Sequence, residues 1–151
     1  ETNNKLSSLG PDPLSSDIHI DTFKERLFCK NRGGEKTICE GLMNQKTISG
    51  VGNYIKAEVL WLSKVSPLRK IKDLSDYEIT SIRDNIQKVI RASFSDGGAT
   101  IKTFYGPDGT KGSYSSRFLV YNQKFDPYSN DVIRTKTPDG RTTHWVPQIQ
   151  I

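Results

Sequence analysis

The sequence predicts a mainly α-helical fold followed by a small β part. Segments with helical spacing of apolar residues lie before Gly97-Gly98, and short β-prone segments separated by turn residues follow it. A length of 151 residues suits one domain, or two small ones tightly joined. We therefore expect a polar linker over residues 1–16, a helical domain over residues 17–98 and a β-rich region over residues 99–151.

Four helices account for the first part. The first, over residues 20–30, carries apolar residues on one side, and Gly33-Gly34 stops it. The second covers residues 36–43, and the third covers residues 54–63, before Ser66-Pro67. The fourth begins at Ser75-Asp76-Tyr77-Glu78, a capping box whose hydroxyl and carboxylate each accept a backbone amide. Gly97-Gly98 is a typical C-terminal stop for this helix.

Short strands account for the second part. The β-prone segments are residues 100–104, 117–121, 132–135 and 142–146. Between the last two, Pro138-Asp139-Gly140 predicts the tip of a hairpin.

Composition limits the kind of protein. The formal net charge of +5 and the pI near 9.2 favour a polyanionic partner. No apolar run approaches the roughly 20 residues that a membrane helix needs, and no secretory leader opens the chain. Two cysteines, Cys29 and Cys39, are too few for a four-cysteine zinc site. We expect an intracellular monomer without a membrane segment and, because a polar linker opens the chain, the back part of a longer protein.

Gly50-Val51-Gly52-Asn53 precedes the third predicted helix and is the sharpest motif. Glycines allow a tight turn, and the amides at a helix N-terminus suit a phosphate. Asn53 either donates its amide to a phosphate oxygen or only caps the helix. With the preceding helix, the motif has a helix–hairpin–helix outline, so both interpretations stay open.

Arg141 lies beside the predicted hairpin tip. There it could reach a phosphate or a base edge, or it could be a solvated turn residue. On the strand that follows, we expect His144 to be exposed and Trp145 to be packed, with neither binding a metal. We also expect Lys56 and Glu58 to be solvated or salt-bridged surface residues.

The glycine-rich segment over residues 106–112 lacks the Walker pattern, so it predicts a mobile loop and not a nucleotide-triphosphate site. No Ser/His/Asp set, paired carboxylates or catalytic Cys/His spacing is visible in the chain.

Six motifs in order give the chain a resemblance to a known family. They are Leu9-Gly10-Pro11-Asp12-Pro13-Leu14, the stretch from Leu42 through Ser49-Gly50-Val51-Gly52-Asn53-Tyr54 to Glu58, Gly97-Gly98-Ala99-Thr100, Asp108-Gly109, Val120-Tyr121 and Gly140-Arg141-Thr142-Thr143. Together they resemble the C-terminal part of formamidopyrimidine-DNA glycosylase/endonuclease VIII enzymes of base-excision repair. The resemblance implies a helix–two-turn–helix DNA-binding domain followed by a β-hairpin finger.

The resemblance also implies roles for individual residues. Asn53 and the amides around Gly50 and Gly52 would grip a phosphate beside the lesion, and Arg141 would grip the same region and take part in the second elimination step. Tyr121 and Lys36 would also contact DNA, although Glu35 stands at the aligned place of the family's basic contact. The lesion loop would include Asp108, Gly109, Thr110, Lys111 and Gly112.

Two departures from the family pattern are visible. Where the family's zinc finger has four cysteines, this chain has Tyr128, Asp131, Val146 and Ile149. We therefore expect no zinc and a finger held by apolar and aromatic packing, like the zincless finger of plant, viral and vertebrate members. The family's N-terminal proline nucleophile and the glutamate after it have no counterpart here.

The resemblance implies a function for the chain: the DNA-binding part of a bifunctional DNA glycosylase/AP lyase. Its partner would be damaged DNA, and its location the nucleus or wherever DNA is repaired. The alternative is a non-catalytic helix–hairpin–helix module that binds nucleic acid.

Overall fold

The structure is a computed structural model that describes residues 10–15, 17–95 and 118–151. Within these ranges it is mainly helical and ends in a two-stranded antiparallel hairpin, which confirms the predicted fold class. The helices and strands are α2 (Ile20–Cys29), η1 (Arg32–Gly34), α3 (Ile38–Met43), α4 (Asn53–Ser63), η2 (Ile71–Asp73), α5 (Asp76–Ser95), β1 (Ile133–Lys136) and β2 (Thr142–Trp145).

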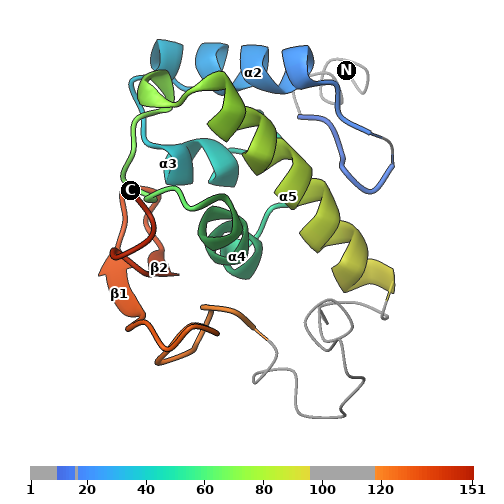
Figure 1. Ribbon diagram of the computed structural model, residues 1–151. Coiled ribbons are helices and arrows are strands. Elements are labelled where there is room, and N and C mark those ends of the chain that lie inside the picture. The colour runs from blue at the N-terminus through green and yellow to red at the C-terminus, as the bar shows by residue number, and fades with distance from the viewer. Residues whose placement is uncertain (1–9, 16, 96–117) are drawn as a thin grey trace.

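Helix α4 lies at the centre of this arrangement. It packs against α5 on one side and against β2 on the other. Helix α2 crosses α5 near the N-terminal end of α5 (Figure 1). The hairpin sits beside α4 and is distant along the chain from the helices it contacts. No helix in the described part of the chain is both long and apolar enough to cross a bilayer.

The helices form around one apolar core. Its fully buried members include Phe23 and Leu27 of α2, Leu60 of α4, and Ile82 and Ile86 of α5. These residues recur at helical spacing, so each helix turns one apolar stripe inward. Burial of such stripes removes apolar surface from water and is the main stabilising term for this part.

Local capping fixes where two helices begin. In the predicted box before α5, the Ser75 hydroxyl accepts the Glu78 N–H at 3.1 Å and the Glu78 carboxylate accepts the Ser75 N–H at 2.9 Å. Helix α3 has a second box, between Thr37 and Glu40, so it begins two residues later than expected. Helix α4 ends near its expected limit, with Lys64 in a left-handed conformation at the C-cap.

Part of the expected linker packs against the loop that precedes α4. Gly10 N–H donates to the Gln45 carbonyl at 2.7 Å, and Ser49 N–H donates to the Pro11 carbonyl at 3.0 Å. A Cβ at Gly10 would collide with the backbone of Thr47 and Ile48, so this close approach requires glycine.

The β part is smaller than the sequence predicts. The pairing of Arg134 with His144 and of Lys136 with Thr142 confirms the hairpin and its tip. The strand expected over residues 117–121 is wrong for its described part, because residues 118–121 are irregular. The strand expected over residues 100–104 and the stop at Gly97-Gly98 lie outside the described residues.

Candidate nucleic-acid interface

Helix α4 begins at a glycine turn that leaves its first amides without a side-chain cap. Gly50 has a φ of 89°, which glycine adopts without strain, and its N–H donates to Gln45 Oε1 at 3.1 Å. Gly52 occupies the N-cap position, and no side chain caps the helix there. The first amides of α4 therefore present the partial positive charge of a helix N-terminus, which suits an anion.

Asn53 is the first residue of α4 and not its N-cap, so the capping interpretation is wrong. Its Nδ2 donates to the Thr142 carbonyl in the hairpin at 3.0 Å. The amide keeps a second hydrogen, and the buried Oδ1 has no hydrogen-bond partner in the described part of the chain. Asn53 thus connects the glycine turn to the hairpin.

The hairpin brings three cations to the same place. Arg141 is exposed at the tip, just before β2. Arg134 and Lys136 are exposed on β1, and they share one face because side chains alternate along a strand. None of the three forms an ion pair with another described residue. They line a cleft with no carboxylate among its lining residues, which are Asn53, Tyr121, Asn122, Arg134, Lys136, Arg141, Thr142 and His144.

The cleft therefore combines Asn53, Tyr121 and Arg141, which the sequence motifs predicted, with two further cations, Arg134 and Lys136, which they did not predict. The alternation of Arg134, Thr135 and Lys136 in a predicted strand was the available signal. Positive charge without a nearby carboxylate is the electrostatic character expected of a phosphate-binding surface.

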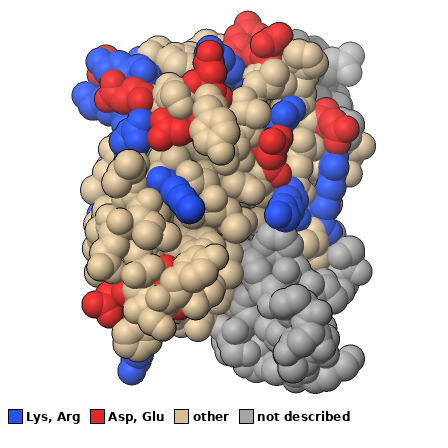
Figure 2. Space-filling view, in the orientation of Figure 1, with Lys and Arg blue, Asp and Glu red and all other residues tan. Residues whose placement is uncertain are grey.

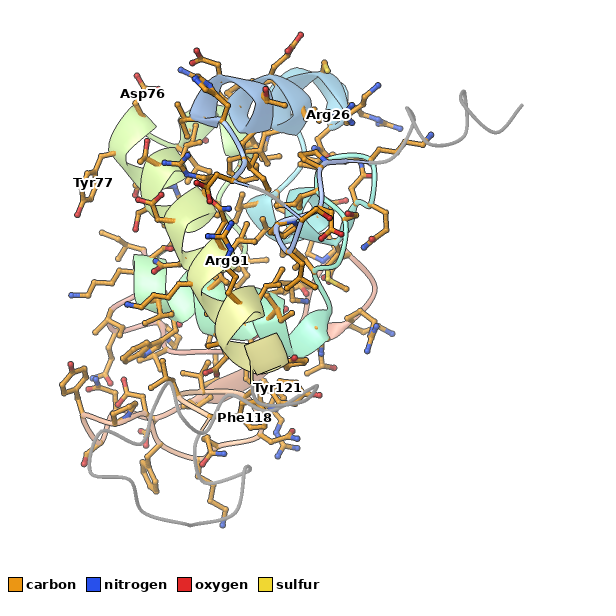
Figure 3. The ribbon with its side chains drawn as sticks, turned by 90° about the vertical axis from the view of Figure 1, so that its right-hand side faces the viewer. Arg26, Asp76, Tyr77, Arg91, Phe118 and Tyr121 are labelled. Atoms are coloured by element: carbon orange, nitrogen blue, oxygen red, sulfur yellow. The ribbon has the colours of Figure 1, made fainter. Side chains whose placement is uncertain are left out.

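Aromatic rings pack against one wall of the cleft. Tyr121 meets the imidazole of His144 edge-on at 5.2 Å between centroids, and it also contacts Phe118 at 5.4 Å. Figure 3 labels Phe118 and Tyr121 below α5 in that view, and Tyr54 of α4 contacts both rings, at 5.7 and 6.1 Å between centroids. Tyr121 is half-buried, so one part of its ring supports the wall and another part faces the cleft.

His144 is buried, at 5% exposure, which corrects the expected exposure. Neither ring nitrogen has a hydrogen-bond partner among the described residues. Burial lowers the pKa of His144 below its ordinary value, and the positive charges of Arg134 and Lys56 lower it further. The imidazole is therefore neutral at neutral pH.

Lys56 and Glu58 are also fully buried, so their assignment to the surface is wrong. Glu58 Oε1 accepts the Leu119 N–H at 2.8 Å, and its Oε2 accepts the N–H groups of Val120 and Tyr121 at 2.9 and 3.0 Å. This carboxylate takes the place of a strand partner, which explains why residues 118–121 hold their position without forming a strand. Both residues are buried because the chain after residue 117 packs against α4 at each of them: residues 119–121 contact Glu58, and the hairpin tip contacts Lys56.

Lys56 makes a different kind of contact with the same region. Its Nζ donates to Asp139 Oδ2 at 2.6 Å, at the hairpin tip. The sequence left open whether Lys56 forms an ion pair, and the structure shows that it does. The pair lies inside the protein, whereas the sequence had predicted a location on its surface.

The rest of the finger is held partly by packing and partly by polar groups. Val146 is buried and the Tyr128 ring stacks on Trp61 at 5.9 Å, as apolar packing predicts, although Tyr128 is exposed. Asp126 accepts hydrogen bonds from Trp61 Nε1 at 3.1 Å and from the backbone of Tyr128 at 2.9 Å and Asn130 at 2.8 Å. These bonds outweigh the effect of burial, which alone would raise its pKa, so the pKa of Asp126 lies below its ordinary value.

Gln150 provides a second polar anchor near the end of the chain. It is buried, its Oε1 accepts the Val146 N–H at 2.7 Å, and its Nε2 donates to the Val65 carbonyl at 3.1 Å. The expectation that apolar and aromatic packing alone holds the finger is therefore incomplete.

Lys36, which the family resemblance also selected, lies away from this cleft. Lys36 is half-buried between η1 and α3, where its carbonyl accepts the Ile71 N–H at 3.0 Å, and it does not line the cleft. The lesion loop over residues 108–112 lies outside the described residues.

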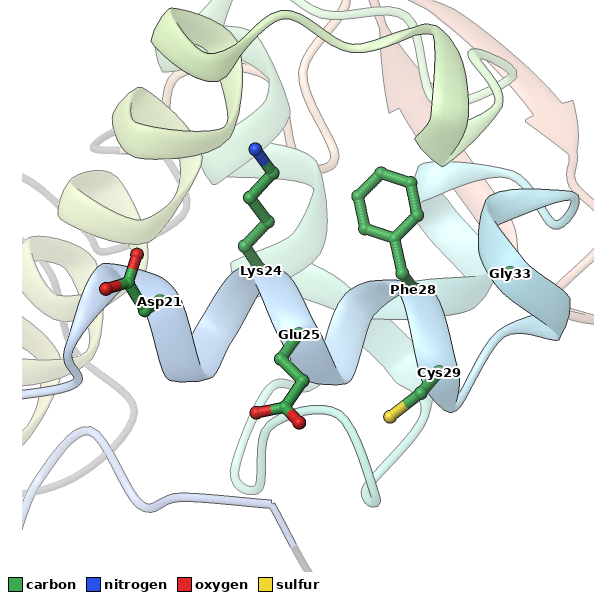
Figure 4. Close-up of a pocket in the computed structure, with 6 residues that line it drawn as sticks. All are labelled: Asp21, Lys24, Glu25, Phe28, Cys29 and Gly33. Carbon is green, nitrogen blue, oxygen red and sulfur yellow. The ribbon is translucent and has the colours of Figure 1, made fainter.

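A second hollow lies along α2, away from the hairpin (Figure 4). Its lining mixes both charges with apolar atoms and comprises Asp21, Lys24, Glu25, Phe28, Cys29 and Gly33. Figure 2 likewise shows acidic and basic side chains interspersed around α2. This mixture contrasts with the carboxylate-free cleft at the hairpin.

Comparison with known proteins decides the family. Residues 9–105 match the model of the formamidopyrimidine-DNA glycosylase H2TH domain. The chain belongs to the formamidopyrimidine-DNA glycosylase family. Residues 113–151 match the C-terminal domain of the same family.

Curated formamidopyrimidine-DNA glycosylases from bacteria resemble nearly the whole chain. The enzyme from Prochlorococcus marinus is 31% identical over 99% of this chain and 52% of its own length. The enzyme from Roseiflexus is 31% identical over 93% of the chain and 51% of its own length. The chain thus spans about half the length of the curated relatives it matches.

Solved structures give the same result for the fold. The Lactococcus lactis glycosylase in complex with abasic-site DNA has a TM-score of 0.79 and 27% identity over 99% of this chain and 54% of its own. The same glycosylase in complex with Fapy-dG DNA has a TM-score of 0.79 and 26% identity, over 99% of this chain and 53% of its own.

The residues that the family resemblance aligns with the four zinc-finger cysteines do not fit zinc. Val146 and Ile149 have no side-chain lone pair to donate, and the Tyr128 ring stacks on Trp61. No group of three or more His, Cys, Asp or Glu residues in the described part of the chain could hold a metal ion. A tetrahedral zinc site needs four such ligands or three with a water, so these positions do not supply one.

Proposed function

We propose that this chain is the DNA-binding part of a bifunctional DNA glycosylase/AP lyase that removes oxidised bases and nicks the strand. One observation carries the proposal: Asn53 reaches from the uncapped start of α4 to the hairpin beside Arg141, at a cleft with three cations and no carboxylate. The DNA complexes of the Lactococcus lactis glycosylase support it.

Different residues of the cleft would contact different parts of the DNA backbone. The amides at Gly52 and Asn53 and the free Asn53 hydrogen would bind one phosphate, while Gly50, whose N–H donates to Gln45, would shape the turn that presents them. Arg141 would fork onto phosphate oxygens beside the lesion, which lysine cannot do bidentately. Tyr121 would flank this contact, while Arg134 and Lys136 would extend the positive surface along β1.

The chemistry would come from a domain outside this chain, because no residue here matches the family's nucleophile. An N-terminal secondary amine would attack C1′ of a flipped nucleotide, release the base through a Schiff base and leave the sugar open to successive eliminations. Arg141 would assist the second elimination, and a loop including residues 108–112 would cover the flipped base. The protein would therefore act inside the cell, wherever DNA is repaired, which in a cell with a nucleus is the nucleus.

Finer features of the family resemblance belong to the same proposal. We propose a division into a linker over residues 1–16, a helix–two-turn–helix domain over residues 17–98 and a zincless finger region over residues 99–151, acting as a monomer. Elemental analysis should detect no stoichiometric zinc, and a chelator should leave the finger folded. About one zinc per chain would overturn the zincless assignment.

DNA binding by the 151-residue chain tests the proposed interface. A labelled duplex with a tetrahydrofuran abasic analogue would be titrated by fluorescence anisotropy at several salt concentrations. We expect R141A and N53A each to weaken binding about tenfold, because a charge-assisted or buried hydrogen bond is lost. We also expect R141A to reduce the salt slope by about one.

The matched control is K30A, which removes an exposed positive charge at the C-cap of α2. Its affinity should stay within about twofold of the unchanged chain, since only a screened long-range charge is lost. If R141A and N53A bind as K30A does, the cleft is not the interface. If N53A loses only thermal stability, Asn53 has only a structural role.

Experiments on the complete protein separate the enzyme from a non-catalytic nucleic-acid-binding module. Borohydride should trap a covalent complex on oxidised-base and abasic duplexes if a secondary amine forms a Schiff base. R141A should suppress excision of damaged bases far more than nicking at abasic sites, because only excision must extrude a base. Absence of trapping on both duplexes would favour the non-catalytic module.

A further inference from the structure

Lys56 and Asp139 form an ion pair inside the protein. The distance between Nζ and Oδ2 is 2.6 Å, and the two side chains are 0% and 1% exposed. Desolvation offsets most of the attraction in such a pair, and apolar residues of the same volume often give equal or greater stability. Stability alone therefore does not explain why charges occupy this place.

The pair is continuous with the hydrogen bonds that shape the hairpin tip. The Thr137 hydroxyl contacts the other Asp139 oxygen and lies 2.9 Å from the Arg141 carbonyl oxygen. Thr137 N–H donates to that same carbonyl at 3.0 Å, and Gly140 N–H donates to the Thr137 carbonyl at 2.9 Å. Thr137 thereby links the Asp139 carboxylate to the backbone carbonyl of Arg141, two residues further along the chain.

Helix α4 also holds the other side of Arg141. Asn53 and Lys56 are three residues apart, so they lie on one face of α4. Asn53 holds Thr142 through its carbonyl, and Lys56 holds Asp139 through its carboxylate. The first turn of α4 therefore fixes the chain immediately after Arg141 and two residues before it.

We propose that Lys56 is a positioning residue, which through Asp139 holds Arg141 in register with the uncapped amides of α4. The guanidinium and the helix N-terminus would then engage the same stretch of phosphodiester backbone. An ion pair suits this task because it is directional, whereas an apolar contact would let the tip slide. This inference rests on the proposed function of the cleft.

A double-mutant cycle on the 151-residue chain tests the inference, with the tetrahydrofuran duplex as probe. The pair is removed as K56M/D139N, so that no unpaired charge stays buried. R141A should weaken binding about tenfold in the unchanged chain but only about twofold in the K56M/D139N background. Such non-additivity is expected only if Arg141 depends on the pair for its position.

An exposed ion pair provides the matched control. Lys24 and Asp76 are also 2.6 Å apart, but their side chains are 44% and 83% exposed, and they join α2 to α5. In K24M/D76N, which removes the same two charges, R141A should keep its full tenfold effect. A similar loss of the R141A effect in this control would overturn the inference, because the coupling would not be specific to the buried pair.

The other outcomes separate this inference from the proposed function. An equal R141A effect in the unchanged and K56M/D139N backgrounds would refute positioning and leave Arg141 as a DNA contact. No R141A effect in the unchanged chain would refute the contact and the positioning with it. If K56M/D139N does not fold, T137V gives the cycle, because it leaves the ion pair intact and removes the hydroxyl that lies between Asp139 and the Arg141 carbonyl. The same criteria then apply.

Discussion

The helices of this protein bury a continuous cluster of apolar side chains that includes Ile18 and Ile90. In the described part of the chain, the apolar cluster between α4 and the hairpin region has four buried members, which are Ala57, Trp61, Val120 and Val146. Around this smaller cluster lie buried polar groups, among them Lys56, Glu58, Asp126, Asp139 and Gln150. Helix α4 belongs to both regions, because it contributes Val59 and Leu60 to the first cluster and Ala57 and Trp61 to the second.

This difference shows how a small region acquires a defined shape. A short hairpin with its loops cannot bury enough apolar surface to order itself. Hydrogen bonds from Glu58 and Asp126 to several backbone amides replace part of that burial and impose direction as well. The helical part can therefore tolerate changes of shape among apolar residues, whereas the hairpin region depends on individual polar atoms.

The largest expected effect is on the helical core. I82A should lower the free energy of unfolding by about 3–4 kcal/mol, because it removes a fully buried side chain and leaves a cavity. Urea denaturation at pH 7 measures this, and I82V should cost only about 1 kcal/mol. A loss below about 1 kcal/mol for I82A would show that the apolar cluster is not the main support of the helices.

A slightly smaller effect is expected from the carboxylate that holds residues 119–121. E58A leaves their three amides without this acceptor and should cost about 2–3 kcal/mol, while E58Q keeps one acceptor and should cost less. Amide hydrogen exchange should rise most at Leu119, Val120 and Tyr121. Unchanged exchange at these amides in E58A would contradict the contrast between the two regions.

The response to pH should also differ between the regions. The pKa of His144 in the folded protein is below its ordinary value of 6.5, so its stabilising contribution is complete above pH 6.5 and is lost as pH falls toward the folded pKa. The loss is at most about 1.4 kcal/mol per pH unit. The protection factors of hairpin amides, which correct for the intrinsic exchange rate, should therefore fall as the pH drops from 6.5 toward 5, and H144F should remove that fall.

The helical part should respond only at lower pH. Burial alone would raise the pKa of Glu78, but hydrogen bonds from Ser75 and Arg69 hold it below its ordinary value of 4.5. Its contribution is therefore present above pH 4.5 and lost below it. Equal loss of protection in α5 and in the hairpin between pH 6.5 and 5 would erase this distinction.

The smallest expected effect concerns the exposed edge of the finger. Y128A should cost about 0.5–1 kcal/mol, since it removes the ring that stacks on Trp61. Y77A is the control, because Tyr77 is 81% exposed on α5, and its cost should stay within about 0.5 kcal/mol. Thermal unfolding of both variants measures the difference, and equal values would mean that the stack contributes nothing.

Features built from neighbours in the chain could be predicted from the sequence. The apolar spacing of α5, its Ser75–Glu78 capping box and the tip at Pro138-Asp139-Gly140 each depend on residues a few positions apart. The resemblance that selected Asn53, Tyr121 and Arg141 for one site depends likewise on short motifs in order, and the structure places these three at one cleft.

The tertiary structure alone decided what surrounds the polar side chains. Lys56 meets a partner 83 positions away and Glu58 meets one 62 positions away, so no local pattern distinguishes them from surface residues of an amphipathic helix. The same holds for His144, which Tyr121 covers, and for Asn53, whose carbonyl partner lies in the hairpin. Burial of a polar group depends on which distant segment packs against it, and that choice is made by the whole fold.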